Sequence, residues 1–145
     1  MSNRRSLNEM PKRLQVYIVE DSRIMQRLLG SVIEAAGAEL SGCSADAQIA
    51  IGDLLTLQPD LILIDIGLAS GSGLDVLKAL QERSLVPGAT KVVLTNYANA
   101  EYQNFCLRLG ADRFFDKSLE TLQALGFINA LAAEKRSSGA PAAPH

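Results

Sequence analysis

Short apolar runs alternate along the chain with longer stretches in which apolar residues recur every three or four positions. The short runs are typical of buried strands and the longer stretches of amphipathic helices. The pattern predicts strands at 14–19, 38–42, 61–65, 90–95 and 112–116. It predicts helices at 22–36, 45–57, 73–84, 98–109 and 118–134. Five strand-then-helix units indicate an α/β fold in which a five-stranded parallel sheet is doubly wound by five helices.

Residues that are typical of helix starts and ends lie between these elements and support a single domain over residues 13–134. Ser22 can cap the first helix, and Gly37 stands where a helix commonly ends on a glycine. Residues 1–12 carry several Lys and Arg residues and are predicted to form a flexible basic arm. Residues 135–145 have the Ser, Ala and Pro content of a disordered tail.

Composition narrows the class of protein. Of the 145 residues, 48% are apolar and 21% are charged, which is typical of a globular protein. The net charge of −2 argues against a general nucleic-acid binder, which is usually strongly basic. No apolar stretch approaches the ~20 residues needed to cross a bilayer, so no membrane association is predicted.

The cysteine and histidine content excludes several chemistries. Cys43 and Cys106 form no CxxC pair and are interpreted as small buried apolar residues, which fits a reducing cytoplasm. The single histidine, His145, is the last residue of the printed sequence. A Ser-His-Asp triad and a zinc site built on histidine are therefore not expected in the folded domain.

Acidic residues follow two of the predicted strands. Glu20 and Asp21 come after the first strand, and Asp65 ends the third. If the strand order is 2-1-3-4-5, these two strands flank the point where ligands bind in doubly wound sheets. Carboxylates a few ångströms apart repel by roughly 4 kcal/mol per pair at an effective dielectric of 20. Such a cluster requires a divalent cation or a proton and is a candidate functional site.

Two further polar residues complete this candidate site. Thr95 follows the fourth strand and Lys117 follows the fifth. Three carboxylates suit Mg²⁺, a hard cation that prefers oxygen ligands. With the charge neutralised, one carboxylate can act as a nucleophile toward phosphorus. The metal ion, the hydroxyl and the ammonium group could then each hold one oxygen of a phosphoryl group.

Four segments of the chain resemble the receiver domain of two-component response regulators, in particular the single-domain, chemotaxis-regulator-like members. Asp21, Asp65, Thr95 and Lys117 are separated by 44, 30 and 22 residues, as in that family. The resemblance covers roughly residues 13–134 and implies a flavodoxin-like fold. The segments are Val19–Arg23, Leu63–Leu68, Leu94–Asn96 and Gly110–Lys117.

The resemblance also implies a role for each matching residue. Asp65 would accept a phosphoryl group from a sensor histidine kinase or a histidine phosphotransfer protein. Asp21 and Asp65 would bind Mg²⁺ directly, together with the backbone carbonyl of Gly67, and Glu20 would hold a metal-bound water.

Further residues would respond to the phosphoryl group. Thr95 and Lys117 would bind its oxygens, and Thr95 and Phe114 would act as the switch. The family tunes hydrolysis through the positions of Gly67 and Tyr97. A bulky ring at 97 could shield the acyl phosphate from water and predicts slow loss of phosphate.

The resemblance implies a cytoplasmic signalling protein that is not an enzyme beyond Mg²⁺-dependent self-phosphorylation and slow self-dephosphorylation. Phosphorylation would switch the surface formed by 98–109, 112–116 and 118–134 for binding an unknown downstream protein target or for phosphorelay. Apolar stripes predict the buried sides of the last two helices. The stripe residues are Tyr102, Phe105, Cys106 and Leu109, and then Leu122, Leu125 and Ile128.

Two departures from the family pattern leave an alternative open. Ser118 stands where the family usually has a proline after the lysine, so we predict a trans peptide bond and expect Ser118 to cap the last helix. Ala69 stands where a proline is common, which predicts a more flexible loop after Asp65. The alternative function is a receiver-fold docking module that works without phosphorylation.

Overall fold

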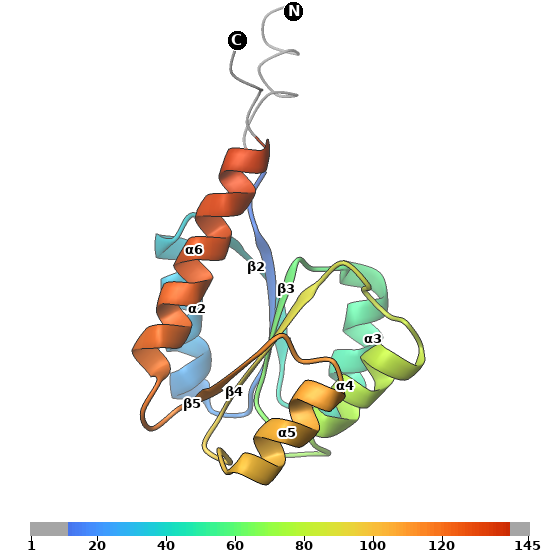
Figure 1. The fold of residues 1–145 in the computed structure, drawn as a ribbon. Helices are drawn as coiled ribbons and strands as arrows, with labels where there is room; N and C mark the ends of the chain where they lie inside the picture. Colours follow the sequence, from blue (N-terminus) through green and yellow to red (C-terminus); the bar gives the residue numbers. More distant parts are fainter. Residues whose placement is uncertain (1–11, 140–145) are drawn as a thin grey trace, which may run out of the picture.

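The computed structural model describes residues 12–139, which form a five-stranded parallel sheet between two layers of helices (Figure 1). The basic arm, apart from its last residue, and residues 140–145 lie outside this range. The strand order is β2-β1-β3-β4-β5, which confirms the predicted order. The strands are β1 (Gln15–Val19), β2 (Glu39–Ser44), β3 (Leu61–Ile64), β4 (Thr90–Thr95) and β5 (Arg113–Asp116).

Five helices cover the two faces of the sheet. On one face lie α2 (Arg23–Ala35) and α6 (Thr121–Gly139); on the other lie α3 (Ala47–Leu57), α4 (Gly73–Glu82) and α5 (Ala100–Arg108) (Figure 1). All four residues of β3 are buried because helices pack on both of its faces. This explains why its sequence is a continuous apolar run rather than an alternating one. Among the described residues, no helix has both the length and the apolar character needed to cross a membrane.

Helix caps place the loops that carry the acidic residues. The Ser22 side chain accepts a hydrogen bond from the Met25 N–H, so α2 begins at Arg23, two residues after Asp21. Gly37 follows the end of α2 with φ +77°, a conformation that favours glycine. Both features agree with the sequence-based prediction.

The last helix differs from the prediction at both ends. It begins at Thr121 rather than 118, so Ser118 does not cap it. Ser118 lies in a turn, where its N–H donates to Asp116 Oδ1 at 2.8 Å. The helix also continues to Gly139, so residues 135–139 are helical and not part of a disordered tail. The Lys117–Ser118 bond is trans as expected, since residues 12–139 contain no cis peptide.

Three residues expected in the core are exposed. Cys43 lies on the edge strand β2 and is exposed, whereas Cys106 is buried. Phe105 is 36% exposed and Leu122 is 81% exposed. The stripe predicted for α6 is right for Ile128, which is fully buried, and for Leu125, which packs against the core, but not for Leu122. The other buried residues on this side are the small Ala124 and Ala132.

Candidate functional site

Three carboxylates meet at the carboxyl ends of β1 and β3. The two strands are paired in parallel, with Val19 opposite Ile64, so the residues that follow them lie side by side. Carboxylate oxygens of Glu20, Asp21 and Asp65 all lie within 4.8 Å of one another. Glu20 and Asp65 are buried and Asp21 is exposed, which leaves the cluster open to solvent on one side.

Lys117 supplies the positive charge in this cluster. It follows β5, and its Nζ lies 2.7 Å from Glu20 Oε1 and 2.9 Å from Asp65 Oδ2. Burial acts to lower the pKa of the Lys117 ammonium group. Its hydrogen bonds to Asp65 and Glu20 and their negative charges together outweigh burial, so the pKa is raised. The ammonium group is therefore held in its charged form between two acids.

Glu20 is the least exposed of the three acids. Burial is the main influence on its pKa and raises it, against the hydrogen bonds from Lys117 and from the Ser22 N–H. The Ser22 N–H donates to Glu20 Oε2 at 3.0 Å. Glu20 thus depends on its partners to remain ionised at this position.

The predicted switch residues lie on the neighbouring strands β4 and β5. Thr95 is the last residue of β4 and is fully buried, and its carbonyl accepts a hydrogen bond from the Lys117 N–H at 2.9 Å. Phe114 lies opposite Val93 in the β4–β5 pair and is partly buried against the core beneath α3, α4 and α5. These contacts place the Thr95 and Lys117 backbones next to each other at the rim of the sheet.

Tyr97 covers one side of the site. Its ring lies so close to Gly67 that a Cβ at position 67 would collide with it. The Tyr97 N–H donates to Thr95 Oγ1 at 3.2 Å, and the Tyr97 residue remains 53% exposed. The two positions predicted to tune hydrolysis are therefore in direct contact.

The loop after Asp65 is held by hydrogen bonds, although its composition predicts flexibility. Ser72 Oγ donates to the Ile66 carbonyl at 3.1 Å, and the Gly73 N–H donates to the same carbonyl at 3.0 Å. A Cβ at Gly73 would collide with the backbone carbonyl of Asp65. The glycine therefore allows α4 to start directly against the acidic residue.

Two contacts at the site were not predicted from the sequence. Ser118 Oγ donates to Asn96 Oδ1 at 3.3 Å, which links the loop after β4 to the loop after β5. The Tyr102 ring packs edge-to-face on the Tyr97 ring. Neither pair has a regular spacing in the sequence, and Tyr102 was assigned to the core face of its helix.

The donor set fits a hard divalent cation. Three carboxylate groups contribute oxygen atoms in one small volume, and Mg²⁺ prefers oxygen ligands and retains several waters. The exposed Asp21 leaves access for those waters. The described residues of this cluster include no histidine or cysteine, so a site for a soft metal is not indicated.

Comparison with known proteins identifies the family. The model of the response regulator receiver domain matches residues 16–126. The match covers most of the chain, which therefore belongs to this family of two-component signalling domains.

The similarity to a curated relative is confined to part of that protein. A protein-glutamate methylesterase/protein-glutamine glutaminase of Treponema pallidum (strain Nichols) is 34% identical over 107 residues, or 72% of this chain and 26% of that protein. The chain thus spans about a quarter of the length of this curated relative.

Solved structures show the same fold. A CheY-like receiver domain protein from Methanospirillum hungatei JF-1 has a TM-score of 0.74 at 24% identity, covering 88% of this chain and 99% of that one. A chain of the CheX-CheY-BeF3-Mg²⁺ complex from Borrelia burgdorferi has a TM-score of 0.73 at 21% identity, covering 81% and 88%. At these identities the likeness concerns the fold.

Proposed function

We propose that this receiver domain accepts a phosphoryl group on Asp65 from the phosphohistidine of a sensor histidine kinase or a histidine phosphotransfer protein. One observation carries the proposal: a buried aspartate is bound by Lys117 inside a cluster of three carboxylates at the carboxyl edge of the sheet. A structural ion pair would not require two further acids beside it. Their mutual repulsion makes a purely structural cluster unfavourable.

In the proposed transfer, a carboxylate oxygen of Asp65 attacks phosphorus. The O–P bond forms as the N–P bond to the donor imidazole breaks, and that electron pair stays on the ring nitrogen. The Lys117 ammonium lies 2.9 Å from Asp65 Oδ2, where it can neutralise charge on the incoming oxygens. The Thr95 hydroxyl would bind a second oxygen.

Mg²⁺ is the proposed cofactor. Asp21, Asp65 and the Gly67 carbonyl would hold it directly, and Glu20 would hold it through water. When bound, it would neutralise the carboxylates and polarise the phosphoryl oxygens. The components named for the Borrelia burgdorferi complex include Mg²⁺ and BeF3, which supports the same chemistry here.

Three strongly exposed apolar residues close in sequence to the site support a protein as the phosphoryl donor. Ile24, Leu119 and Leu122 are 81%, 80% and 81% exposed, the highest values among the large apolar residues described. Ile24 lies in the first turn of α2, three residues after Asp21. Leu119 lies in the turn before α6 and Leu122 in its first turn, two and five residues after Lys117. The helices α2 and α6 cover the same face of the sheet (Figure 1). Exposed apolar patches mark interaction surfaces.

The proposed output is a change in the surface formed by α5, β5 and α6. Phosphorylation adds roughly −1.5 to −2 charges, which would draw Thr95 and Lys117 toward the phosphoryl group. Phe114 would then turn into the space that is left, and the surface would bind a downstream protein or pass the phosphoryl group on. On this proposal the chain acts in the cytoplasm as a switch, with no catalytic activity toward other molecules.

Phosphoramidate tests the proposal, because it carries the same kind of P–N bond as phosphohistidine. With Mg²⁺, the wild-type protein and a Glu82→Gln control at the end of α4 should each gain the mass of one phosphoryl group. Asp65→Asn should gain nothing. If no variant gains mass, the domain is a docking module that works without phosphorylation.

A further inference from the structure

We propose that Tyr102 is a positioning residue that holds the Tyr97 ring over the site and thereby prolongs the lifetime of the phosphoryl group on Asp65. The inference rests on the proposed phosphorylation of Asp65. It assigns a role to Tyr102 of α5, a residue that takes no direct part in the phosphoryl chemistry. Three structural observations lead to it.

First, the Tyr97 ring occupies the space beside Gly67, and the residue is exposed to solvent. Besides the colliding Cε2, ring atoms Cδ2 and Cζ lie 3.3 Å from the place of a Cβ on Gly67. The backbone at 97 is fixed by the hydrogen bond from its N–H to Thr95 Oγ1. With the residue 53% exposed, however, the ring itself could rotate toward solvent.

Second, Tyr102 provides the contact that opposes this rotation. The two ring centroids are 6.0 Å apart with an interplanar angle of 63°, an edge-to-face arrangement that aromatic rings favour. Tyr102 in turn has a firm base. Its N–H donates to Asn99 Oδ1 at 2.8 Å in the first turn of α5, and its ring packs against the core.

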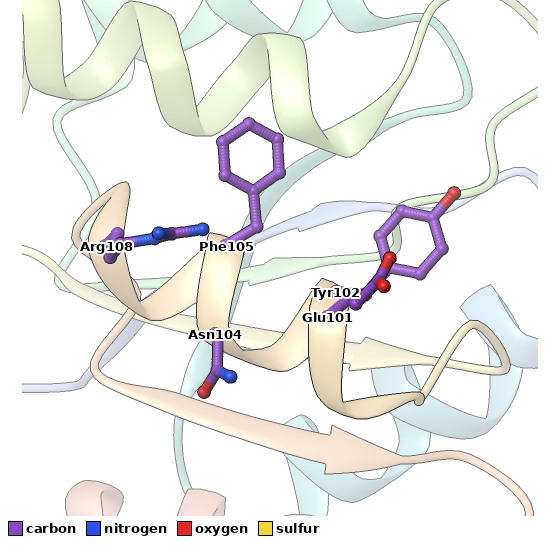
Figure 2. A pocket seen from close by; sticks show the side chains of 5 residues that line it. All are labelled: Glu101, Tyr102, Asn104, Phe105 and Arg108. Carbon is purple, nitrogen blue, oxygen red and sulfur yellow. The ribbon is translucent and has the colours of Figure 1, made fainter.

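Third, Tyr102 belongs to the α5 surface as well as to the site. Together with Glu101, Asn104, Phe105 and Arg108 it lines a shallow pocket of about 520 Å³. Figure 2 shows Tyr102 and Phe105 projecting to one side of α5, whereas Asn104 points to the other. Tyr102 therefore connects the predicted output surface to the ring that covers the site.

The step that Tyr102 would slow is hydrolysis. A water oxygen bonds to phosphorus, the bond from phosphorus to the Asp65 carboxylate oxygen breaks, and its electron pair returns to the carboxylate. Both protons of the water leave with inorganic phosphate. A ring held beside Gly67 narrows the path of this water, whereas a rotated ring opens it. From the strength of edge-to-face pairs, losing Tyr102 should shorten the lifetime about two- to tenfold.

Variants of the two tyrosines test the inference. Each protein is loaded with phosphoramidate and Mg²⁺, the donor is removed, and loss of the phosphoryl mass is followed with time. Tyr102→Leu keeps an apolar contact with the core but lacks a ring. Tyr102→Phe keeps the ring, and Asn104→Ala is the matched control on the other side of α5.

Tyr102→Leu and Tyr97→Ala should shorten the lifetime by similar factors, and the double variant should be no faster than the Tyr97 variant alone. Tyr102→Phe and Asn104→Ala should retain the wild-type lifetime. A wild-type lifetime in Tyr102→Leu would refute the role of Tyr102 while leaving the phosphorylation of Asp65 intact. Failure of the wild-type protein to take up phosphate would refute both.

Discussion

Replacing Lys117 by Met should destabilise the fold far more than removing an ordinary lysine. The Nζ atom lies 2.7 Å from Glu20 and 2.9 Å from Asp65, whose side chains are only 3% and 8% exposed. Methionine keeps the apolar stem but removes the charge and the hydrogen bonds. Two buried carboxylates would then face each other, and the exposed Asp21 close by, without a counter-charge.

The size of the effect follows from these contacts. Removing one partner of a buried ion pair costs about 3–5 kcal/mol, because the other charge is left buried and unpaired. Proton uptake by Glu20 would relieve part of this, so we expect a loss of about 3 kcal/mol near neutral pH. Lys135→Met is the matched control. Its partner Asp60 lies 3.1 Å away in a pair that is about one third exposed, and we expect a loss below about 1 kcal/mol.

Urea unfolding in the presence of a chelator measures both losses. The loss in Lys117→Met should shrink as the pH falls from neutral toward the ordinary carboxyl pKa of about 4.3. The reason is that burial already raises the pKa of Glu20, and without Lys117 the pKa would rise further. An acid whose pKa is higher in the folded state than in the unfolded state stabilises the fold as the pH falls. Equal losses in the two variants, independent of pH, would refute this reasoning.

Three further predictions concern the scaffold. Gly73→Ala should lose about 1–3 kcal/mol in urea unfolding, because its Cβ would collide with the Asp65 carbonyl. Gly52→Ala, where nothing lies within 4 Å of a Cβ, should be neutral or gain up to about 1 kcal/mol, and equal effects would contradict the close approach. Burial raises the pKa of Cys106 to about 11, so a thiol reagent near neutral pH should label Cys43 in the folded protein and Cys106 only after unfolding. Equal labelling of both thiols in the folded protein would show that Cys106 is not protected. For the same reason stability should fall as the pH rises from about 9 toward 11, because the unfolded thiol loses its proton first.

The sheet and the acidic cluster could be predicted from the sequence because each depends on a local signal. The apolar run of β3 and its acidic end reveal a buried strand and a carboxylate at its carboxyl edge. The parallel pairing of β1 and β3 then places Glu20 and Asp65 at adjacent positions along the carboxyl edge of the sheet. Lys117 follows β5 and therefore lies at the same edge, next to the acids that it binds.

Contacts between loops could not be predicted in this way. Tyr97 precedes α5 and Tyr102 lies within it, so no helical or strand period relates the two rings. The turn around Ser118 depends on Asp116, whose Oδ1 accepts a hydrogen bond from the Ser118 N–H, and the residue type of Ser118 alone predicts a cap instead. The exposure of Leu122 depends on which side of α6 meets the sheet, and small residues on that side carry little apolar signal.

The position of the phosphoryl group is the most direct test of the proposed function. After treatment with phosphoramidate and Mg²⁺, fragmentation of the peptides by mass spectrometry should locate the added group on Asp65. A phosphoryl group on any other residue, or none at all while Mg²⁺ is present, would contradict the account.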